Sequence, residues 1–230
     1  MKILPSHLVV ILVVIASVLV ATAQPAALAK KTRVACVGDS ITQGGGADGG
    51  KSYPSQLQEV LGNGWEVGNF GVSARTLMRK GDFPYWNEDA FKKAQAFKPN
   101  VVIVMLGTND SKPHNWQHKA DFAKDYTDLI QTFLALESKP QVYICRPVPV
   151  VGDGAYGINE SGIKEQIEIL NQLAEKLPVG IIDMHAALLD HPDTIPDRVH
   201  PNAQGTALMA QAARKVLLEK FPSAGDKATR

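Results

Sequence analysis

Short apolar runs alternate with longer amphipathic segments along most of the chain. The apolar runs are rich in Val and Ile, and several are apolar on both faces, which is typical of parallel strands covered by helices. The expected strands are residues 33–37, 66–70, 101–106, 141–145 and 180–182. The segments between them have the i, i+3, i+4 spacing of helices. The expected helices are residues 53–61, 87–97, 119–136, 161–177 and 201–220, with Pro201 in the first turn of the last one.

This alternation of strands and helices predicts a doubly wound α/β fold with right-handed crossovers. The pattern shows no repeat and no linker, so we expect one domain over residues 30–220 and a flexible tail over residues 221–230. Ligands of such folds bind beyond the carboxyl ends of the strands. The residues that follow the strands are therefore the first candidates for a functional site.

The first residues of the chain have a different pattern. Lys2 is followed by residues 8–20, which are apolar except for Ser17, and then by Ala-x-Ala motifs that end at residues 23 and 29. A helix of this length rises about 20 Å, which is short of the roughly 30 Å of a bilayer core. These features predict a signal peptide over residues 1–23, with a second cleavage candidate after residue 29. The alternative is a retained membrane anchor. We expect a secreted or periplasmic protein without stable membrane association after cleavage.

The net charge of the chain bears on whether nucleic acid is an expected partner. Lys and Arg total 24 and Asp and Glu total 23, so the formal net charge is +1. Nucleic-acid binders carry clustered basic residues, and this chain has no run of Lys or Arg. Nucleic acid is therefore excluded as an expected partner.

Four segments combine the residue types that acyl transfer from an ester requires. Ser40 follows the first strand and can act as the nucleophile, while His200 can take its proton as the base. Asp197 can bind the second imidazole nitrogen and hold the useful tautomer of the base. The backbone N–H groups of Ser40 and Gly71 and the Asn109 side chain are candidate donors for an oxyanion hole.

These segments resemble the four sequence blocks of the SGNH (GDSL-type) hydrolases. The blocks are Gly-Asp-Ser at residues 38–40, Gly71, Gly-Thr-Asn-Asp at residues 107–110 and Asp-x-x-His at residues 197–200, in family order. The resemblance implies a flavodoxin-like three-layer sandwich with a five-stranded parallel sheet in the order 2-1-3-4-5. It also implies a Ser-His-Asp mechanism through an acyl-enzyme, without metal or cofactor. The first block continues with Ile41 where the family name has Leu, which resembles the carbohydrate acetylesterase branch.

The two cysteines of the chain are expected to remain free. Cys36 and Cys145 lie in the expected first and fourth strands, and in this sheet order one strand separates them. Two strand spacings amount to about 9.6 Å, whereas a disulfide needs Cα atoms within about 7 Å. We therefore expect two buried thiols.

Several residues have alternative interpretations. Asp193 and Asp183 are rivals for the residue that orients His200, although Asp193 is seven positions away and Asp183 closes a strand. Asp110 is expected to cap a helix. Residues 45–52 match the G-x-x-x-x-G-K-[ST] phosphate-binding pattern, but they do not directly follow a strand as that motif requires. Residues 114–118 have the H-x-x-x-H spacing of a zinc site, but no third ligand is evident.

The connections favour a small acyl group on a polar alcohol. Residues 72–88 and 146–159 are polar and aromatic and offer no lid or acyl tunnel. The predicted substrate is an O-acetylated carbohydrate, and the alternatives are a lysophospholipase, a thioesterase or an arylesterase. A non-catalytic carbohydrate-binding protein is the alternative from a different class. Asp39, Arg75, Trp116 and Arg146 are candidate substrate-binding residues, with Trp116 as a stacking surface for a sugar. The oligomeric state stays open.

Overall fold

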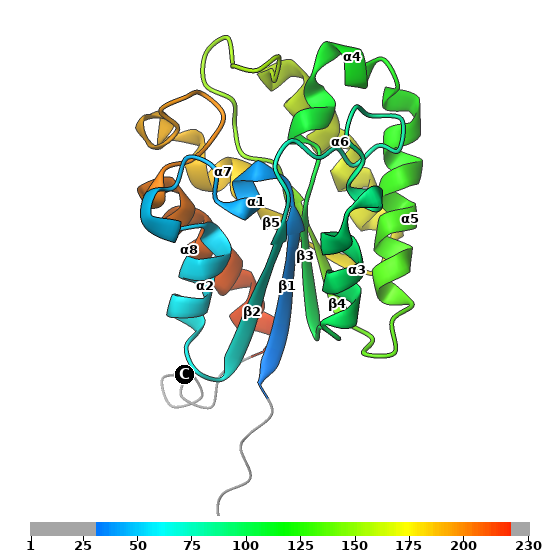
Figure 1. Cartoon of the computed structure of the whole chain (residues 1–230), viewed down its shortest axis with the longest axis vertical. Coiled ribbons are helices and arrows are strands. Elements are labelled where there is room, and N and C mark those ends of the chain that lie inside the picture. Colours follow the sequence, from blue (N-terminus) through cyan, green and yellow to red (C-terminus); the bar gives the residue numbers. More distant parts are fainter. Residues whose placement is uncertain (1–30, 222–230) are drawn as a thin grey trace, which may run out of the picture.

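The computed structural model describes residues 31–221, so the predicted signal peptide lies outside the described residues. Its centre is a five-stranded sheet in which every neighbouring pair is parallel. The strands are β1 (Thr32–Gly38), β2 (Trp65–Gly71), β3 (Val101–Met105), β4 (Gln141–Arg146) and β5 (Val179–Asp183). Their order is β2-β1-β3-β4-β5, which confirms the predicted topology. All strands end at one edge of the sheet, at the top in Figure 1.

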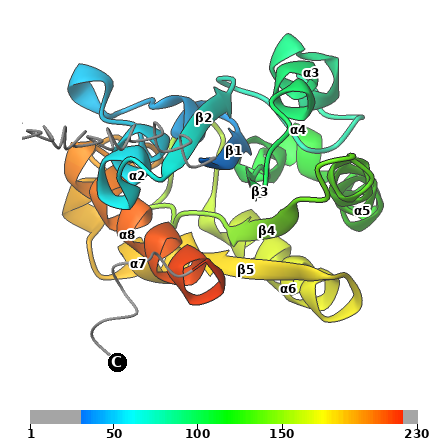
Figure 2. The same ribbon diagram turned by 90° about the horizontal axis from the view of Figure 1, so that it is seen from below.

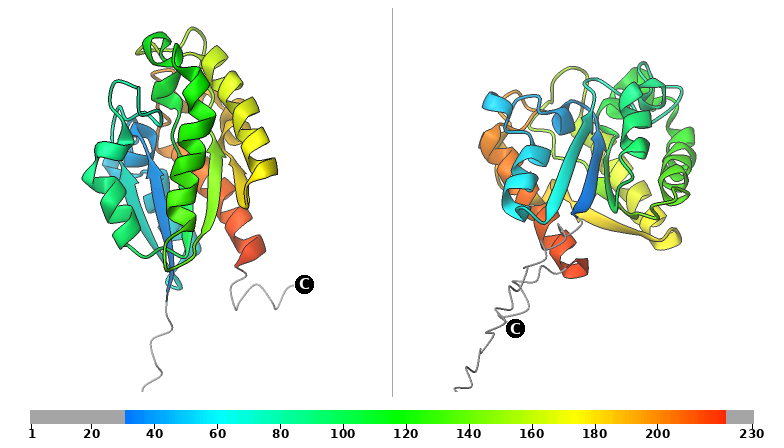
Figure 3. Two further views of the ribbon diagram at one scale, coloured as in Figure 1. Left: turned by 90° about the vertical axis from the view of Figure 1, so that its right-hand side faces the viewer. Right: turned by 60° about the horizontal axis from the view of Figure 1, so that its bottom comes forward.

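Helices cover both faces of this sheet. The main ones are α2 (Tyr53–Leu61), α3 (Asp89–Ala96), α5 (Phe122–Leu134), α6 (Glu160–Lys176) and α8 (Ala203–Lys220). In Figure 2, α2 and α8 lie on one face and α3, α5 and α6 on the other. The left panel of Figure 3 shows the green α5 and the yellow α6 across the second face. Within residues 31–221, no helix is long and apolar enough to cross a membrane.

Alternation along β1 shows how the sequence builds two cores. Val34 and Cys36 pack into the core under α2 and α8, whereas Ala35 and Val37 pack into the core under α3 and α5. All four are fully buried. A strand that is apolar on both faces therefore serves two layers of helices.

Both cysteines are buried and free, as predicted. Cys36 lies on β1 and Cys145 on β4, and β3 separates these strands. Burial raises the pKa of the Cys36 thiol to about 12.

Three short helices were not predicted: α1 (Ser40–Gln43), α4 (Pro113–Trp116) and α7 (Met184–Leu189). The last helix also begins later than expected, because the Asn202 side chain caps α8 by accepting from two backbone N–H groups. Pro201 therefore precedes the helix instead of occupying its first turn. Phe221 was assigned to the tail, but its ring packs edge-on against Trp65 with 6.0 Å between centroids. Residues 222–230 lie outside the described residues.

Hydrogen bonds from side chains join α2 to α8, which lie far apart in the sequence. Gln56 Nε2 on α2 donates to Ala203 O at 2.9 Å and to Thr206 Oγ1 at 2.8 Å, both at the start of α8. Arg214 Nε donates to Val60 O at 3.1 Å farther along. These contacts hold the segment before α8 beside the loop that follows β1.

Candidate active site

A tight turn at the end of β1 presents Ser40. The Asp39 side chain caps α1 by accepting from Ile41 N at 3.0 Å, so Ser40 is the first residue of this short helix. Gly38 is required here, because a Cβ would lie 2.0 Å from Thr42 Oγ1 and 2.6 Å from Met105 O. The glycine therefore lets α1 fold directly back onto the strand ends.

Ser40, His200 and Asp197 form one hydrogen-bonded chain. Ser40 Oγ lies 2.9 Å from His200 Nε2, and His200 Nδ1 lies 2.7 Å from Asp197 Oδ2. The other carboxylate oxygen, Oδ1, accepts from the backbone N–H of His200 at 2.6 Å and of Val199 at 3.0 Å. The structure thus brings together the three residues that the sequence predicted as nucleophile, base and orienting acid.

Partial burial tends to raise the pKa of the Asp197 carboxyl, but the hydrogen bonds from His200 and Val199 outweigh it and hold the pKa below its ordinary value. The ionised Asp197 favours the imidazole tautomer that carries a proton on Nδ1. His200 Nε2 is then free to accept a proton from Ser40. This arrangement suits general-base activation of a serine.

A pocket of about 290 Å³ opens beside this chain of residues. Its lining consists of Ser40, Ser73, Ala74, Asn109, Lys112, Tyr156, Ile158 and His200. A pocket this small, with small side chains next to the serine, suits a short acyl group.

Asn109 reaches the pocket as expected, but Gly71 does not. The Gly71 N–H donates to Asn69 Oδ1 at 2.9 Å, so it already has an acceptor. Glycine is needed at this position for packing, because a Cβ would lie 2.3 Å from Gln43 N of α1. The predicted oxyanion role of Gly71 is therefore corrected.

Ala74 lines the pocket where Gly71 was expected. Its φ of 65° is unusual for a residue with a side chain and turns the backbone at this point. Among the described residues, no acceptor is bonded to the Ala74 N–H. Sequence reasoning missed this residue, because an alanine in a left-handed conformation has no signature in the sequence.

Asp110 holds the segment that follows Ala74. Its carboxylate accepts from Leu77 N and from Met78 N, each at 2.8 Å. Burial, with a smaller contribution from the nearby Asp39, raises the pKa of Asp110 to about 7. Asp110 lies inside a 3₁₀ turn (Thr108–Ser111), so it anchors a distant loop and does not cap a helix as predicted.

Two of the predicted substrate-binding residues support the site from behind. Asp39 is fully buried, and burial raises the pKa of its carboxyl to about 6. Arg75 Nε forms an ion pair with Glu88 at 2.7 Å, and the Arg75 carbonyl accepts from Asn109 Nδ2 at 3.2 Å. Neither residue lines the pocket. We therefore assign to both a positioning role instead of the predicted contact with substrate.

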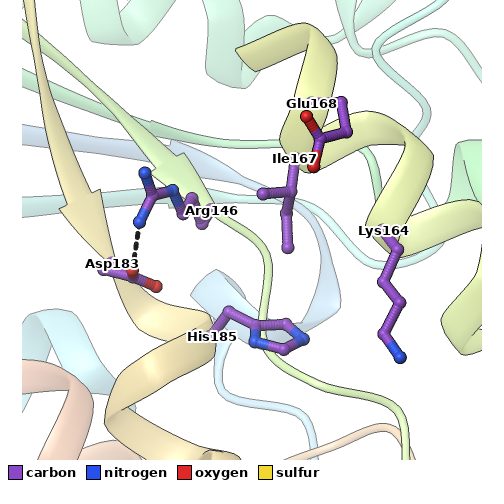
Figure 4. A pocket seen from close by; sticks show the side chains of 6 residues that line it. All are labelled: Arg146, Lys164, Ile167, Glu168, Asp183 and His185. Atoms are coloured by element: carbon purple, nitrogen blue, oxygen red, sulfur yellow. Dashed lines mark hydrogen bonds and ion pairs between the residues drawn. The ribbon is translucent and has the colours of Figure 1, made fainter. Parts of the chain in front are cut away.

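The other two predicted substrate-binding residues lie elsewhere. Trp116 packs against Phe122 with 5.3 Å between ring centroids and donates from Nε1 to Glu165 at 3.0 Å. Arg146 pairs with Asp183 in a second pocket of about 300 Å³, which Figure 4 shows between α6 and the start of α7. Neither lines the Ser40 pocket, because each has a partner that holds it on another part of the surface.

Residues of the phosphate-binding pattern and of the histidine pair form hydrogen bonds and ion pairs with other residues of this chain. In the phosphate-binding pattern, Lys51 Nζ pairs with Glu59 at 3.0 Å and the Ser52 side chain caps α2. In the histidine pair, His114 Nε2 lies 3.1 Å from Asp82 Oδ2. Within the part of the chain that the structure describes, no three His, Cys, Asp or Glu side chains cluster as metal ligands would.

Comparisons with known proteins agree with this geometry. The chain is 42% identical over 208 residues to an acetylxylan esterase of Xylanibacter ruminicola, covering 81% of this chain and 43% of that protein. It thus spans about two fifths of the length of this relative.

Two solved structures share the fold. An aryl esterase of M. smegmatis has a TM-score of 0.67 at 21% identity, covering 82% of this chain and 99% of that one. A carbohydrate acetylesterase family member from Sinorhizobium meliloti has a TM-score of 0.66 at 21% identity, covering 84% and 100%.

The model of the GDSL-like lipase/acylhydrolase family matches residues 36–208, which include all four blocks described above. This match confirms the predicted family resemblance. The chain belongs to the GDSL-like lipase/acylhydrolase family.

Proposed function

We propose that this protein is a serine esterase that removes acetyl groups from O-acetylated carbohydrates. The observation that carries the proposal is the chain Ser40–His200–Asp197, which opens into a small pocket. The likeness to an acetylxylan esterase supports an acetylated polysaccharide as the substrate class.

The proposed reaction starts when Ser40 Oγ attacks the ester carbonyl carbon while its proton passes to His200 Nε2. The tetrahedral intermediate collapses, the bond to the sugar oxygen breaks, and His200 returns the proton to that oxygen. Water then attacks the acetyl-enzyme with the same base, releasing acetate and restoring Ser40. Asp197 stays ionised and stabilises the imidazolium in both steps.

Three donors are proposed for the oxyanion. The Ser40 N–H is at the start of α1, and Ala74 and Asn109 line the same pocket. Donors placed in advance stabilise the charge that develops on the carbonyl oxygen. The Arg75 carbonyl accepts from Asn109 Nδ2 at 3.2 Å and holds this side chain in position, whereas the contact of Nδ2 with Asp39 Oδ2 is long, at 3.5 Å, so the second Nδ2 hydrogen can turn to the oxyanion.

The location of the enzyme is part of the proposal. We infer from residues 1–23 that export through a signal peptide delivers the domain of residues 30–220 to the periplasm or the medium. Acetylated polysaccharides are too large to enter a cell unprocessed, so an exported enzyme suits this substrate.

The test compares p-nitrophenyl acetate, butyrate and octanoate with acetate release from acetylated xylan. It uses the chain from Gln24 onward with Ser40→Ala as the matched variant. We expect turnover that prefers acetate, persists in a metal chelator and is lost with Ser40→Ala. Preference for octanoate would replace the proposal with a lipid esterase, and preference for aryl acetates over acetylated xylan would replace it with an arylesterase. Carbohydrate binding without turnover dependent on Ser40 would indicate a non-catalytic binding protein.

A further inference from the structure

Tyr156 is an exposed aromatic residue at the mouth of the Ser40 pocket. It lies in the connection between β4 and α6, lines the pocket, and is 64% exposed. Aromatic side chains that line a pocket are common sites of ligand contact. This residue was not among the predicted site residues.

The backbone at Tyr156 is unfavourable for a tyrosine. Its φ is 56°, and that of the next residue, Gly157, is 79°. Ile158 N donates to Ala155 O at 2.8 Å, so Tyr156 and Gly157 are the two central residues of a tight turn. Positive φ at both central positions is the geometry that Asn and Gly favour. A tyrosine kept at such a position points to a function of its side chain.

The side chain is fixed against the proposed base. Its ring lies 5.7 Å from the His200 ring, between centroids, with an angle of 57° between the planes. The Tyr156 hydroxyl donates to Asp197 Oδ2 at 3.3 Å. His200 hands its proton to the leaving alcohol, so that alcohol must lie on the His200 side of the pocket. Tyr156 therefore borders the leaving group.

The loop that carries Tyr156 is anchored at its base. Val150 N donates to Glu160 Oε2 at 2.7 Å, and Val151 N donates to Arg198 O at 3.0 Å, two residues from His200. The ring is thus placed before a ligand arrives, which lowers the entropy lost on binding.

We propose that Tyr156 forms a platform for the sugar ring that carries the acetyl group. The proposal rests on the proposed function and adds the subsite for the leaving alcohol. A pyranose has a face of C–H groups that packs against an aromatic ring, while its hydroxyl groups stay in water. The exposed Tyr156 ring offers such a face, whereas Trp116 is held against Phe122.

The experiment compares two acetate esters that differ in the size of the alcohol. Acetylated xylobiose presents a sugar ring to Tyr156, and ethyl acetate is too small to cover the platform. Acetate release gives kcat and KM for both substrates with the wild type, Tyr156→Leu and Tyr156→Phe. We expect Tyr156→Leu to raise KM for acetylated xylobiose about tenfold more than KM for ethyl acetate. Tyr156→Phe, which keeps the ring, should retain the wild-type ratio between the two substrates.

Phe83→Leu is the matched control, because Phe83 is 53% exposed and does not line the pocket. It should leave the ratio unchanged. Equal losses on both esters with Tyr156→Leu would overturn the platform and assign Tyr156 to positioning His200 instead. If the wild type hydrolyses acetylated xylobiose and Tyr156→Leu changes KM for neither ester, only the platform is overturned. A wild type that hydrolyses ethyl acetate but not acetylated xylobiose would overturn the proposed substrate class, and the platform with it.

Discussion

Replacing Asp197 by asparagine tests the proposed tautomer of His200. Asp197 Oδ1 accepts from two backbone N–H groups, and Oδ2 faces His200 Nδ1 at 2.7 Å. An asparagine has only one oxygen. If this oxygen stays on the two backbone N–H groups, its NH₂ group donates to His200 Nδ1. The proton of the imidazole must then be on Nε2, which faces Ser40 Oγ at 2.9 Å.

In this tautomer His200 cannot take the serine proton. The corresponding loss in a serine hydrolase is about 10⁴-fold in kcat, equivalent to about 5 kcal/mol of transition-state stabilisation. The change barely alters the pocket lining, so KM should stay within about threefold of the wild-type value. Initial rates on p-nitrophenyl acetate at pH 7 measure both parameters, with Ser40→Ala as the background.

Asp193→Asn is the control, because Asp193 is an exposed carboxylate seven positions from His200. It removes the same charge close by in the sequence and should keep kcat unchanged. If Asp197→Asn retained more than a tenth of wild-type kcat, Asp197 would not be the residue that orients His200. A large loss with Asp193→Asn would transfer that role to Asp193.

Three other changes test separate parts of the structure. Asn109→Ala removes one oxyanion donor and should lower kcat about 10²–10³-fold in the same assay. Gly71→Ala places a Cβ 2.3 Å from Gln43 N and should lower the free energy of unfolding by about 1–3 kcal/mol in urea, whereas Gly64→Ala, with open space around it, should not. The pKa of Asp110 is raised to about 7, so the stability it contributes is full below its ordinary pKa and is lost as the pH rises through 7. Between pH 5 and pH 8, the wild type should therefore lose about 2–3 kcal/mol more stability in urea unfolding than Asp110→Asn does.

The sheet could be predicted because its signal is local. Strands such as β3 are continuous apolar runs, and Ser40, Asp197 and His200 lie in short motifs with recognisable spacing. The short helices α1, α4 and α7 could not be predicted, because four to six residues are too few to show a helical period.

The rest of the site depends on backbone turns and on partners distant in sequence. Ala74 lines the pocket because the backbone turns there with a positive φ, and an alanine in the sequence does not predict that conformation. Trp116 was the natural candidate for sugar stacking, but Glu165, 49 positions away, holds its indole on another surface. Tyr156 lies beside His200 because of a turn with positive φ, and at such positions Asn or Gly is usual and Tyr is rare. Composition does not reveal which aromatic residue lines the Ser40 pocket.

The packing of α8 on α2 also bears on when the proposed catalytic residues come together during synthesis. Ser40 and His200 are 160 positions apart, and contacts such as Gln56 with Thr206 hold their segments together. A ribosome makes Ser40 160 residues before His200, so the growing chain cannot assemble the proposed triad until His200 has been synthesised and α8 has docked on α2. Contacts this distant in sequence form slowly because they close a long loop. In a refolding experiment, the return of esterase activity would therefore time this last docking step, after helix signals have already recovered.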